Sequence, residues 1–93
     1  MIHKEDLYKA FANENRVKLI VCLAKPKCVT ELLSLCTLSQ SALSQHLKVL
    51  KDAGIVECKR NGKEQIYSVT KEKVIVLAKE LLHLDSVLQK TKN

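Results

Sequence analysis

The feature that most constrains the fold is the dipeptide Asn61-Gly62, which stands between two short segments rich in strand-forming residues. Residues 55–60 and 63–69 carry the β-branched and aromatic residues that strands favour, including Val56, Ile66 and Tyr67. Asn-Gly suits the two central positions of a type I′ turn, which joins antiparallel strands closely. We therefore predict one tight β-hairpin with Asn61-Gly62 at its tip.

The rest of the chain carries helical signals. Apolar residues recur at helical spacing in residues 6–12, 16–25, 29–36, 40–53 and 71–89. Asp6 and Asn15 are expected N-caps, Pro26 ends the second helix, and Gly54 suits the left-handed position that follows a helix. The sequence thus predicts a mainly α fold with a small β-hairpin, in the order α-α-α-α-β-β-α, as one domain over residues 1–93.

The helices over residues 29–36 and 40–53 are separated by Thr37-Leu38-Ser39, which makes them a helix-turn-helix candidate. On the second helix the polar side chains fall within an arc of about 140°, at 100° per residue. Hydroxyl and amide groups of this kind can donate to and accept from base edges. The polar face consists of Gln40, Ser41, Ser44, Gln45, Lys48 and Lys51.

Basic residues surround the tip of the predicted hairpin, at Lys59, Arg60 and Lys63, and the whole chain carries a net charge of +6. A reading helix followed by a basic hairpin is typical of double-stranded-DNA binders, in which the wing touches phosphates. The alternative is a winged-helix protein–protein interaction or adaptor module. An enzyme is not expected, because paired carboxylates, a nucleophile motif and a glycine-rich loop are all missing from the sequence.

The last predicted helix carries Val74, Leu77, Leu81, Leu84 and Leu88, spaced so that they form one continuous apolar seam. No segment of the sequence approaches the roughly 20 apolar residues that span a bilayer. A secretory leader is also missing, so we expect a cytoplasmic protein without membrane contact.

The chain resembles the ArsR/SmtB family of winged helix-turn-helix transcriptional repressors. The resemblance rests on residues 11–16 (FANENR), 28–32 (CVTEL) and above all 39–47 (SQSALSQHL). It implies a homodimeric repressor that binds an imperfect palindromic operator through Gln40, Ser41, Ser44 and Gln45, with the hairpin as the wing. It also implies dimerisation through the first and last helices, with Leu7 and Phe11 joining the apolar seam.

Metal sites of that family are not expected here. Where family members carry Cys-Val-Cys-Asp-Leu, this sequence has Thr30 in place of the second cysteine. The positions that correspond to the family's interface metal site are Lys71, Lys73, Leu84 and Val87, which cannot coordinate zinc. We therefore predict no metal and no cofactor, and we interpret His46 as a core residue and His83 as a partly buried interface residue.

The four cysteines are candidate thiol sensors. The sequence of residues 39–47 most resembles the thiol-sensing and reactive-sulfur-sensing branch of the family. That branch pairs an early cysteine with one near the chain's end, whereas this sequence has none after Cys58. If both are helical, Cys28 and Cys36 lie about 12 Å apart along the axis, too far for a disulfide. A disulfide between Cys22 and Cys28, or between cysteines of two subunits, is geometrically allowed. Cys58 neighbours two basic residues that would favour its thiolate. The small effector is unknown, and all four cysteines would otherwise be buried apolar residues.

Overall fold

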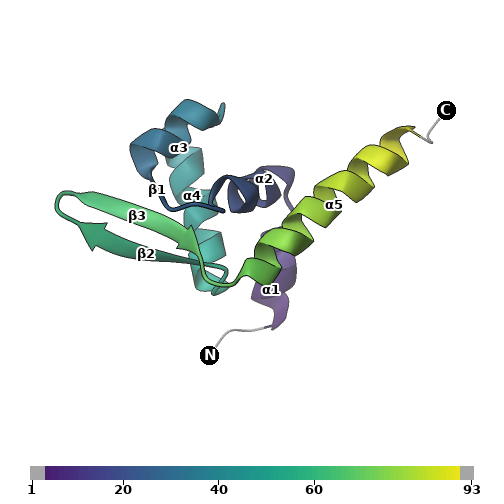
Figure 1. The fold of residues 1–93 in the computed structure, drawn as a ribbon, viewed down its shortest axis with the longest axis horizontal. Helices are drawn as coiled ribbons and strands as arrows, with labels where there is room; N and C mark the ends of the chain where they lie inside the picture. Colours follow the sequence, from purple (N-terminus) through teal and green to yellow (C-terminus); the bar gives the residue numbers. More distant parts are fainter. Residues whose placement is uncertain (1–3, 91–93) are drawn as a thin grey trace.

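The computed structural model describes residues 4–90 as five helices and a small three-stranded sheet (Figure 1). In chain order the elements are α1 Lys4–Phe11, α2 Glu14–Cys22, β1 Lys27–Cys28, α3 Val29–Leu35, α4 Gln40–Asp52, β2 Val56–Asn61, β3 Glu64–Val69 and α5 Glu72–Lys90. The predicted mainly α fold with a winged helix-turn-helix is confirmed. The one added element is β1.

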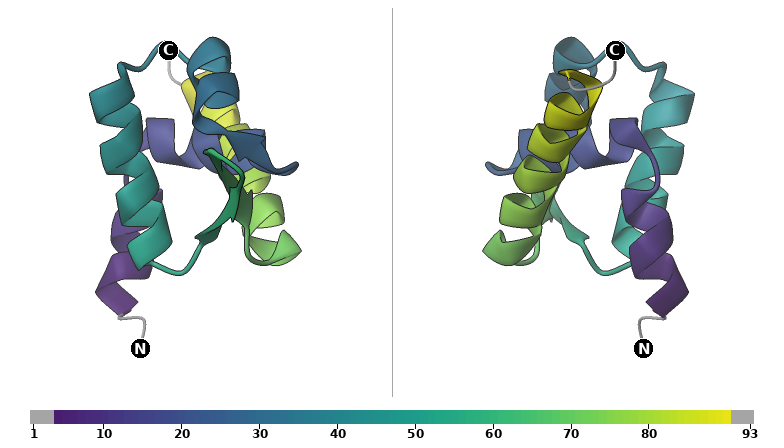
Figure 2. Two further views of the ribbon diagram at one scale, coloured as in Figure 1. Left: turned by 90° about the vertical axis from the view of Figure 1, so that its left-hand side faces the viewer. Right: turned by 90° about the vertical axis from the view of Figure 1, so that its right-hand side faces the viewer.

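Helix α2 forms the centre of the molecule, with α4 and α5 packed on different sides of it (Figure 2). The hairpin β2–β3 extends from one end of the body, and α5 extends from the other (Figure 1). The largest fully buried side chains come from α2, α3, α4 and the residues flanking them: Ile20, Leu23, Leu32, Leu43, Leu47, Leu50 and Ile55. Because α4 contributes three of these, its apolar side is held firmly against the core.

The break between α1 and α2 is shorter than predicted. Asn13, not Asn15, caps α2, because its Oδ1 accepts hydrogen bonds from the backbone N–H groups of Asn15 (2.9 Å) and Arg16 (3.3 Å). Asp6 lies inside α1 and is not its cap. Helix α2 ends at Cys22, three residues before the predicted end. There Lys27 Nζ donates to the carbonyl of Cys22 (2.6 Å), one of the carbonyls that a helix end leaves without an internal partner.

The two ends of α4 follow from local signals. At its start the Ser39 hydroxyl accepts a hydrogen bond from the N–H of Ala42 (3.1 Å). At its end Gly54 adopts φ +74°, a left-handed conformation in which a Cβ would be strained. Hydrogen bonds from Gly54 N to Lys51 O and from Ile55 N to Leu50 O complete a Schellman motif, as the glycine predicted.

The hairpin forms as predicted, but its turn lies one residue later. Asn61 pairs with Glu64, so Gly62 and Lys63 occupy the loop. Gly62 has φ +65°, whereas Asn61 and Lys63 do not have positive φ. A glycine with positive φ at the first central position alone fits a type II′ turn, so the predicted type I′ turn is wrong.

Strand β1 was not predicted. It pairs antiparallel with the free edge of β3, which aligns Lys27 with Tyr67 and Cys28 with Ile66. Two residues are too few for a local strand signal, and an available partner edge decides whether such a strand forms. The hairpin is also tied to the body by Thr70, whose hydroxyl donates to the carbonyl of Gly54 (2.8 Å).

Candidate nucleic-acid interface

The polar face predicted on α4 is open to solvent. Gln40, Ser41, Ser44, Gln45 and Lys48 are all exposed, while Leu43, Leu47 and Leu50 bury the other side of the same helix. This division follows from the helical period, since residues three and four apart share a side. The side chains with base-reading chemistry therefore lie together on one rigid element.

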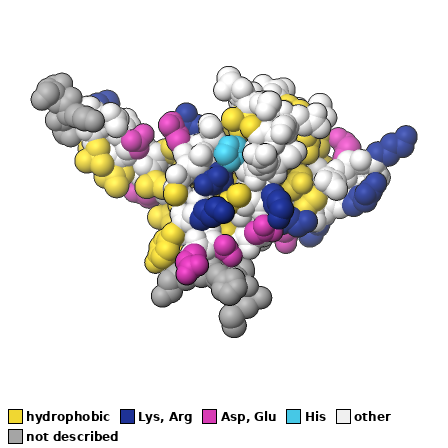
Figure 3. Space-filling view, turned by 180° about the vertical axis from the view of Figure 1, so that it is seen from behind, with side chains coloured by type: hydrophobic (Ala, Val, Ile, Leu, Met, Phe, Trp, Pro, Cys, Tyr) yellow, Lys and Arg dark blue, Asp and Glu magenta, His cyan; other side chains and the backbone are white. Residues whose placement is uncertain are grey.

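The basic side chains of the hairpin are exposed as well. Lys63 lies in the turn, and Arg60 Nε donates to the carbonyl of Gly62 (3.3 Å), which holds the guanidinium over the turn. Lys59 lies 3.9 Å from Glu57, and Lys48 on α4 lies 3.0 Å from Asp52. Exposed pairs of this kind contribute little stability, so both lysines can exchange their carboxylates for phosphates at small cost. In the space-filling view dark-blue side chains mark the end of the molecule that carries the hairpin (Figure 3).

A polar cavity of about 350 Å³ connects the two predicted contact regions. Gln40 and Ser44 of α4 line one part of it, and Lys63 and Gln65 of the hairpin line another. Thr30 lines the same cavity, and neither Thr30 nor Gln65 was among the predicted contact residues. The alternation of β3 could have suggested Gln65, because it shares a face of that strand with Tyr67. Helix and hairpin thus present one continuous polar surface.

A second exposed surface is apolar and lies on α1 and α5. Leu7, Leu77, Leu84 and Leu88 are each 39% to 56% exposed. Val74 and Leu81 instead pack against the core of their own chain, as does Phe11, so the predicted continuous seam is divided. The reason is that α5 must cover α2 with one side, including the fully buried Ala78. In the space-filling view yellow side chains follow the arm that carries α5 (Figure 3).

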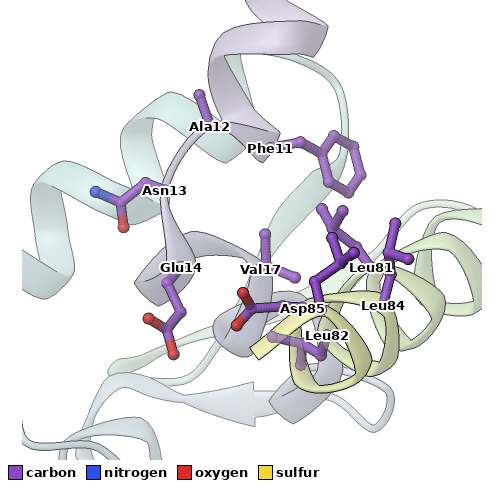
Figure 4. Close-up of a pocket in the computed structure, with 10 residues that line it drawn as sticks. Phe11, Ala12, Asn13, Glu14, Val17, Leu81, Leu82, Leu84 and Asp85 are labelled. Atoms are coloured by element: carbon purple, nitrogen blue, oxygen red, sulfur yellow. The ribbon is translucent and has the colours of Figure 1, made fainter. Parts of the chain in front are cut away.

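The side of α5 that faces the core and the side that is exposed both contribute residues to an open cavity of about 380 Å³. Figure 4 shows Phe11 from the end of α1, Val17 from α2, and Leu81, Leu82 and Leu84 from α5 around it. The carboxylates of Glu14 and Asp85 lie at the same site. This apolar hollow next to exposed leucines is the kind of surface that a second protein chain covers.

The four cysteines are free thiols in distinct surroundings. Cys28 and Cys36 flank α3 at its N-cap and C-cap, so neither is helical as supposed, although they still stand at opposite ends of that helix. Cys58 aligns with Tyr67 on β3, and Cys28 aligns with the next residue, Ile66. Neighbouring positions of a strand point to opposite faces, so the sheet separates Cys28 from Cys58.

Two cysteines do share a cavity, which was not anticipated. Cys22, at the end of α2, and Cys36 both line a hollow of about 430 Å³ together with Leu35 and Leu38. Sequence spacing could not have revealed this, because the path of the chain between the two helices decides it.

Electrostatics disfavour the thiolate of Cys28. The backbone N–H of Glu31 lowers the pKa of this thiol, but the carboxylate of Glu64, burial and the carboxylate of Glu31 together raise it above its usual value. Cys58 lies against the Tyr67 hydroxyl, and burial first and Cys58 second raise the pKa of Tyr67. Because Lys59 pairs with Ile66, next to Tyr67 on β3, its side chain leaves the sheet on the side opposite to Cys58.

One of the two described histidines, His46, differs from its predicted role. His46 is half-buried and lies 3.3 Å from Arg16, so it is a boundary residue and not a core residue. His83 is exposed on α5 of this chain. Within residues 4–90 no three His, Cys, Asp or Glu side chains gather as a metal-ion site, and no helix there is long and apolar enough to cross a membrane.

Comparisons with known proteins point to one family. The family described as "Bacterial regulatory protein, arsR family" matches residues 13–57. The transcriptional activator HlyU of Vibrio cholerae serotype O1 is 40% identical over 83% of this chain and 71% of its own. The arsenical resistance operon repressor of Bacillus subtilis is 32% identical over 84% of this chain and 76% of its own.

Solved structures agree. HlyU from Vibrio cholerae N16961 has a TM-score of 0.75 at 36% identity, covering 86% of this chain and 88% of that one. NolR from Sinorhizobium fredii has a TM-score of 0.75 at 30% identity, covering 86% of this chain and 81% of that one. Since fold, helix-turn-helix and relatives all agree, this chain belongs to the ArsR family and is a DNA-binding transcriptional regulator.

Proposed function

We propose that this regulator is a cytoplasmic homodimeric repressor that binds an imperfect palindromic operator. In each protomer Gln40, Ser41, Ser44 and Gln45 read base edges, and Lys48, Lys59, Arg60 and Lys63 contact phosphates. The observation that carries the proposal is the single polar surface that α4 and the hairpin form around their shared cavity. An α-helix fits the major groove of B-DNA, and a hairpin beside it reaches the adjacent backbone.

The division between reading and phosphate contacts follows from side-chain chemistry. Glutamine can bond an adenine edge with two hydrogen bonds, and serine can accept or donate to several bases. Lysine ammonium groups neutralise phosphates irrespective of sequence and release bound counterions. The net charge of +6 supports this long-range attraction.

The experiment is selection of bound sequences from a random duplex pool, followed by affinity measurements on the selected operator and on a scrambled duplex. We expect Gln40→Ala with Ser44→Ala to abolish the preference for the operator. Lys63→Ala should weaken both duplexes equally and reduce the slope of log affinity against log salt by about one. If the double variant kept its operator preference, α4 would not be the reading helix.

The same measurements distinguish a DNA-binding regulator from a protein-binding adaptor module. A protein-binding module would show no steep salt dependence on duplex DNA and no selected sequence. A regulator should show both, and its selected sequence should contain two half-sites about one helical turn apart. A selected sequence with a single half-site would contradict the homodimer.

The exposed leucines of α1 and α5 support the homodimer. A small monomer with Leu7, Leu77, Leu84 and Leu88 open to water leaves a sizeable apolar surface uncovered. A two-fold axis through this face would bury it against its own copy, next to the cavity of Figure 4. Phe11, Val74 and Leu81 would then support the interface from beneath, because they are partly buried already.

Cys22 and Cys36 support a thiol-based effector response. Of the four candidates, these two line one cavity, whereas the raised pKa of Cys28 disfavours its reactive form and Cys58 lies on the hairpin. With hydrogen peroxide as the oxidant, the two thiols lose two hydrogens and form one S–S bond, while the peroxide is reduced to two waters. The new bond would draw the ends of α2 and α3 together and displace the helix-turn-helix.

Peroxide titration of the operator complex tests this response. Wild type should release DNA and lose two hydrogens by mass, and Cys22→Ser or Cys36→Ser should stop both effects. Cys58→Ser is the matched control and should behave as wild type. Release that survives replacement of both Cys22 and Cys36 would refute the assignment of the pair, and wild-type protein that never responds would refute thiol control.

A further inference from the structure

One guanidinium connects three helices. Arg16, in the first turn of α2, donates from Nε to the carbonyl of Ala10 (3.2 Å) and from Nη2 to the carbonyl of Lys9 (2.8 Å). Both carbonyls lie in the last turn of α1, where carbonyls lack partners within the helix. Nη1 of the same side chain lies 3.3 Å from Nδ1 of His46 on α4.

The chemistry of the two side chains fixes the direction of this last bond. A guanidinium has donors and no acceptor, so Arg16 donates and Nδ1 of His46 accepts. His46 must therefore be neutral, with its proton on Nε2. It directly follows Gln45, which belongs to the proposed reading face, but it points to the half-buried side of α4.

We propose that Arg16 is a positioning residue that fixes the orientation of the reading helix α4 against α1 through His46. This inference rests on the proposed homodimer, in which α1 belongs to the interface. A link from α1 to α4 then transmits the geometry of the interface to the helix that reads DNA. Two reading helices must fit successive grooves of the same duplex, so a small change in their orientation weakens operator binding.

The short connection between α1 and α2 makes α1 depend on tertiary contacts such as this link. Only Ala12 and Asn13 separate the two helices, and α1 has eight residues, too few for stability without tertiary contacts. The positive charge of Arg16 at the C-terminal end of α1 is also favourable toward the helix dipole. Arg16 thus contacts α1 and α4 at once, whereas Lys18, two residues further along α2, pairs with Glu14 on its own helix at 2.8 Å.

The same contact should respond to pH. Burial and, second, the neighbouring Arg16 hold the pKa of His46 below its usual 6.5. Helix α1, which packs on α4, presents the backbone carbonyls of Lys9 and Ala10 to the Arg16 guanidinium. The charged groups on β2 and on α4 itself have other partners: Glu57 of β2 pairs with Lys59, and Lys48 of α4 pairs with Asp52. Protonation of His46 would remove the acceptor and place a second positive charge against Arg16.

The test compares Arg16→Gln with Lys18→Gln, which removes the same charge from the same helix without touching α4. Affinity is measured on operator and scrambled duplexes over a salt series, with thermal unfolding and sedimentation on each variant. Arg16→Gln should bind the operator about tenfold more weakly than Lys18→Gln, as expected for a residue that couples two sites. Its salt slope should stay at the wild-type value.

Variants of His46 provide the conservative rescue and the pH readout. His46→Gln keeps an acceptor and cannot take up a proton, so it should bind like wild type at pH 7.5 and keep that affinity at pH 5.5. His46→Leu removes the acceptor and should match Arg16→Gln. Wild type should lose operator affinity as the pH falls below 6.5.

Three outcomes would overturn the inference. Arg16→Gln could bind the operator as tightly as Lys18→Gln, or it could lower the salt slope by about one with equal loss on every sequence, which would make it a phosphate contact. His46→Leu could bind as tightly as His46→Gln, which decides the matter even if Arg16→Gln fails to fold. Failure of the proposed function is distinguishable, because it would appear as retained operator preference in the Gln40 and Ser44 double variant.

Discussion

Replacing one leucine of α5 tests the dimer surface quantitatively. Leu84 is 50% exposed in the single chain and lies beside Phe11 at the cavity of Figure 4. Complete burial of a leucine is favourable by about 1.5–3 kcal/mol, so covering its remaining half is worth about 1 kcal/mol. Two-fold symmetry doubles this for the dimer, to about 2 kcal/mol.

Leu84→Ser should therefore weaken the dimer about 30-fold, since each 1.4 kcal/mol changes a dissociation constant tenfold. The measurement is sedimentation equilibrium over a series of protein concentrations, alongside thermal unfolding to confirm that the variant is folded. Operator affinity should fall with the dimer and recover at high protein concentration, because the reading face is unchanged.

Leu35→Ser is the matched control, since Leu35 is 58% exposed and lies on α3, outside the α1 and α5 surface proposed for the dimer. It should leave the dimer constant unchanged. The argument fails if Leu84→Ser dimerises within threefold of wild type, if Leu35→Ser weakens the dimer as much, or if the wild-type protein stays monomeric at every concentration.

Three further predictions concern stability. The free energy of unfolding should fall as the pH drops below 6.5, because the unfolded chain protonates His46 more readily than the folded chain does. Well above pH 6.5 the residue is neutral in both states and has no effect. His46→Gln should remove the fall below pH 6.5 when the free energy of unfolding is measured by urea denaturation over a pH series. Gly62→Ala should cost about 1 kcal/mol in urea denaturation from the positive φ alone, since no atom beyond its two chain neighbours lies within 4 Å of the added Cβ. A much larger loss would contradict the turn geometry. Asn13→Ala should cost about 1 kcal/mol by loss of the helix cap, and Asn15→Ala less than about 0.5 kcal/mol; the reverse order, read from thermal midpoints, would restore Asn15 as the cap.

Local signals in the sequence predicted the elements that carry the proposed reading surface. Ser39 and Gly54 bound α4 because a hydroxyl can cap the first turn and a residue without Cβ tolerates φ +74°. The helical period then separates Gln40 and Ser44 from the buried Leu43 and Leu47 without help from the rest of the fold. For the same reason the hairpin was predicted with its approximate bounds.

The predicted helix cap and the predicted turn were wrong at positions where neighbouring residues can form either of two similar local structures. Asn13 and Asn15 are both competent caps, and Asn61-Gly62 and Gly62-Lys63 are both competent turns. The choice between them depends on how α1 meets α2 and on which residues of β2 and β3 pair, and neither is encoded within a few residues. The single seam expected on α5 was divided for a similar reason, because periodicity shows which side chains share a face but not what covers them.

The sequence by itself determined the types of the helices, the hairpin, the polar face of α4 and the resemblance to a family of regulators, because each depends on neighbours within about one or two turns of chain. Only the tertiary structure decided the contacts between distant segments. These are β1 on the edge of β3, the cavity shared by Cys22 and Cys36, and the bond from Arg16 to His46, thirty residues further along the chain. Such contacts follow from the packing of whole helices, which no local pattern records.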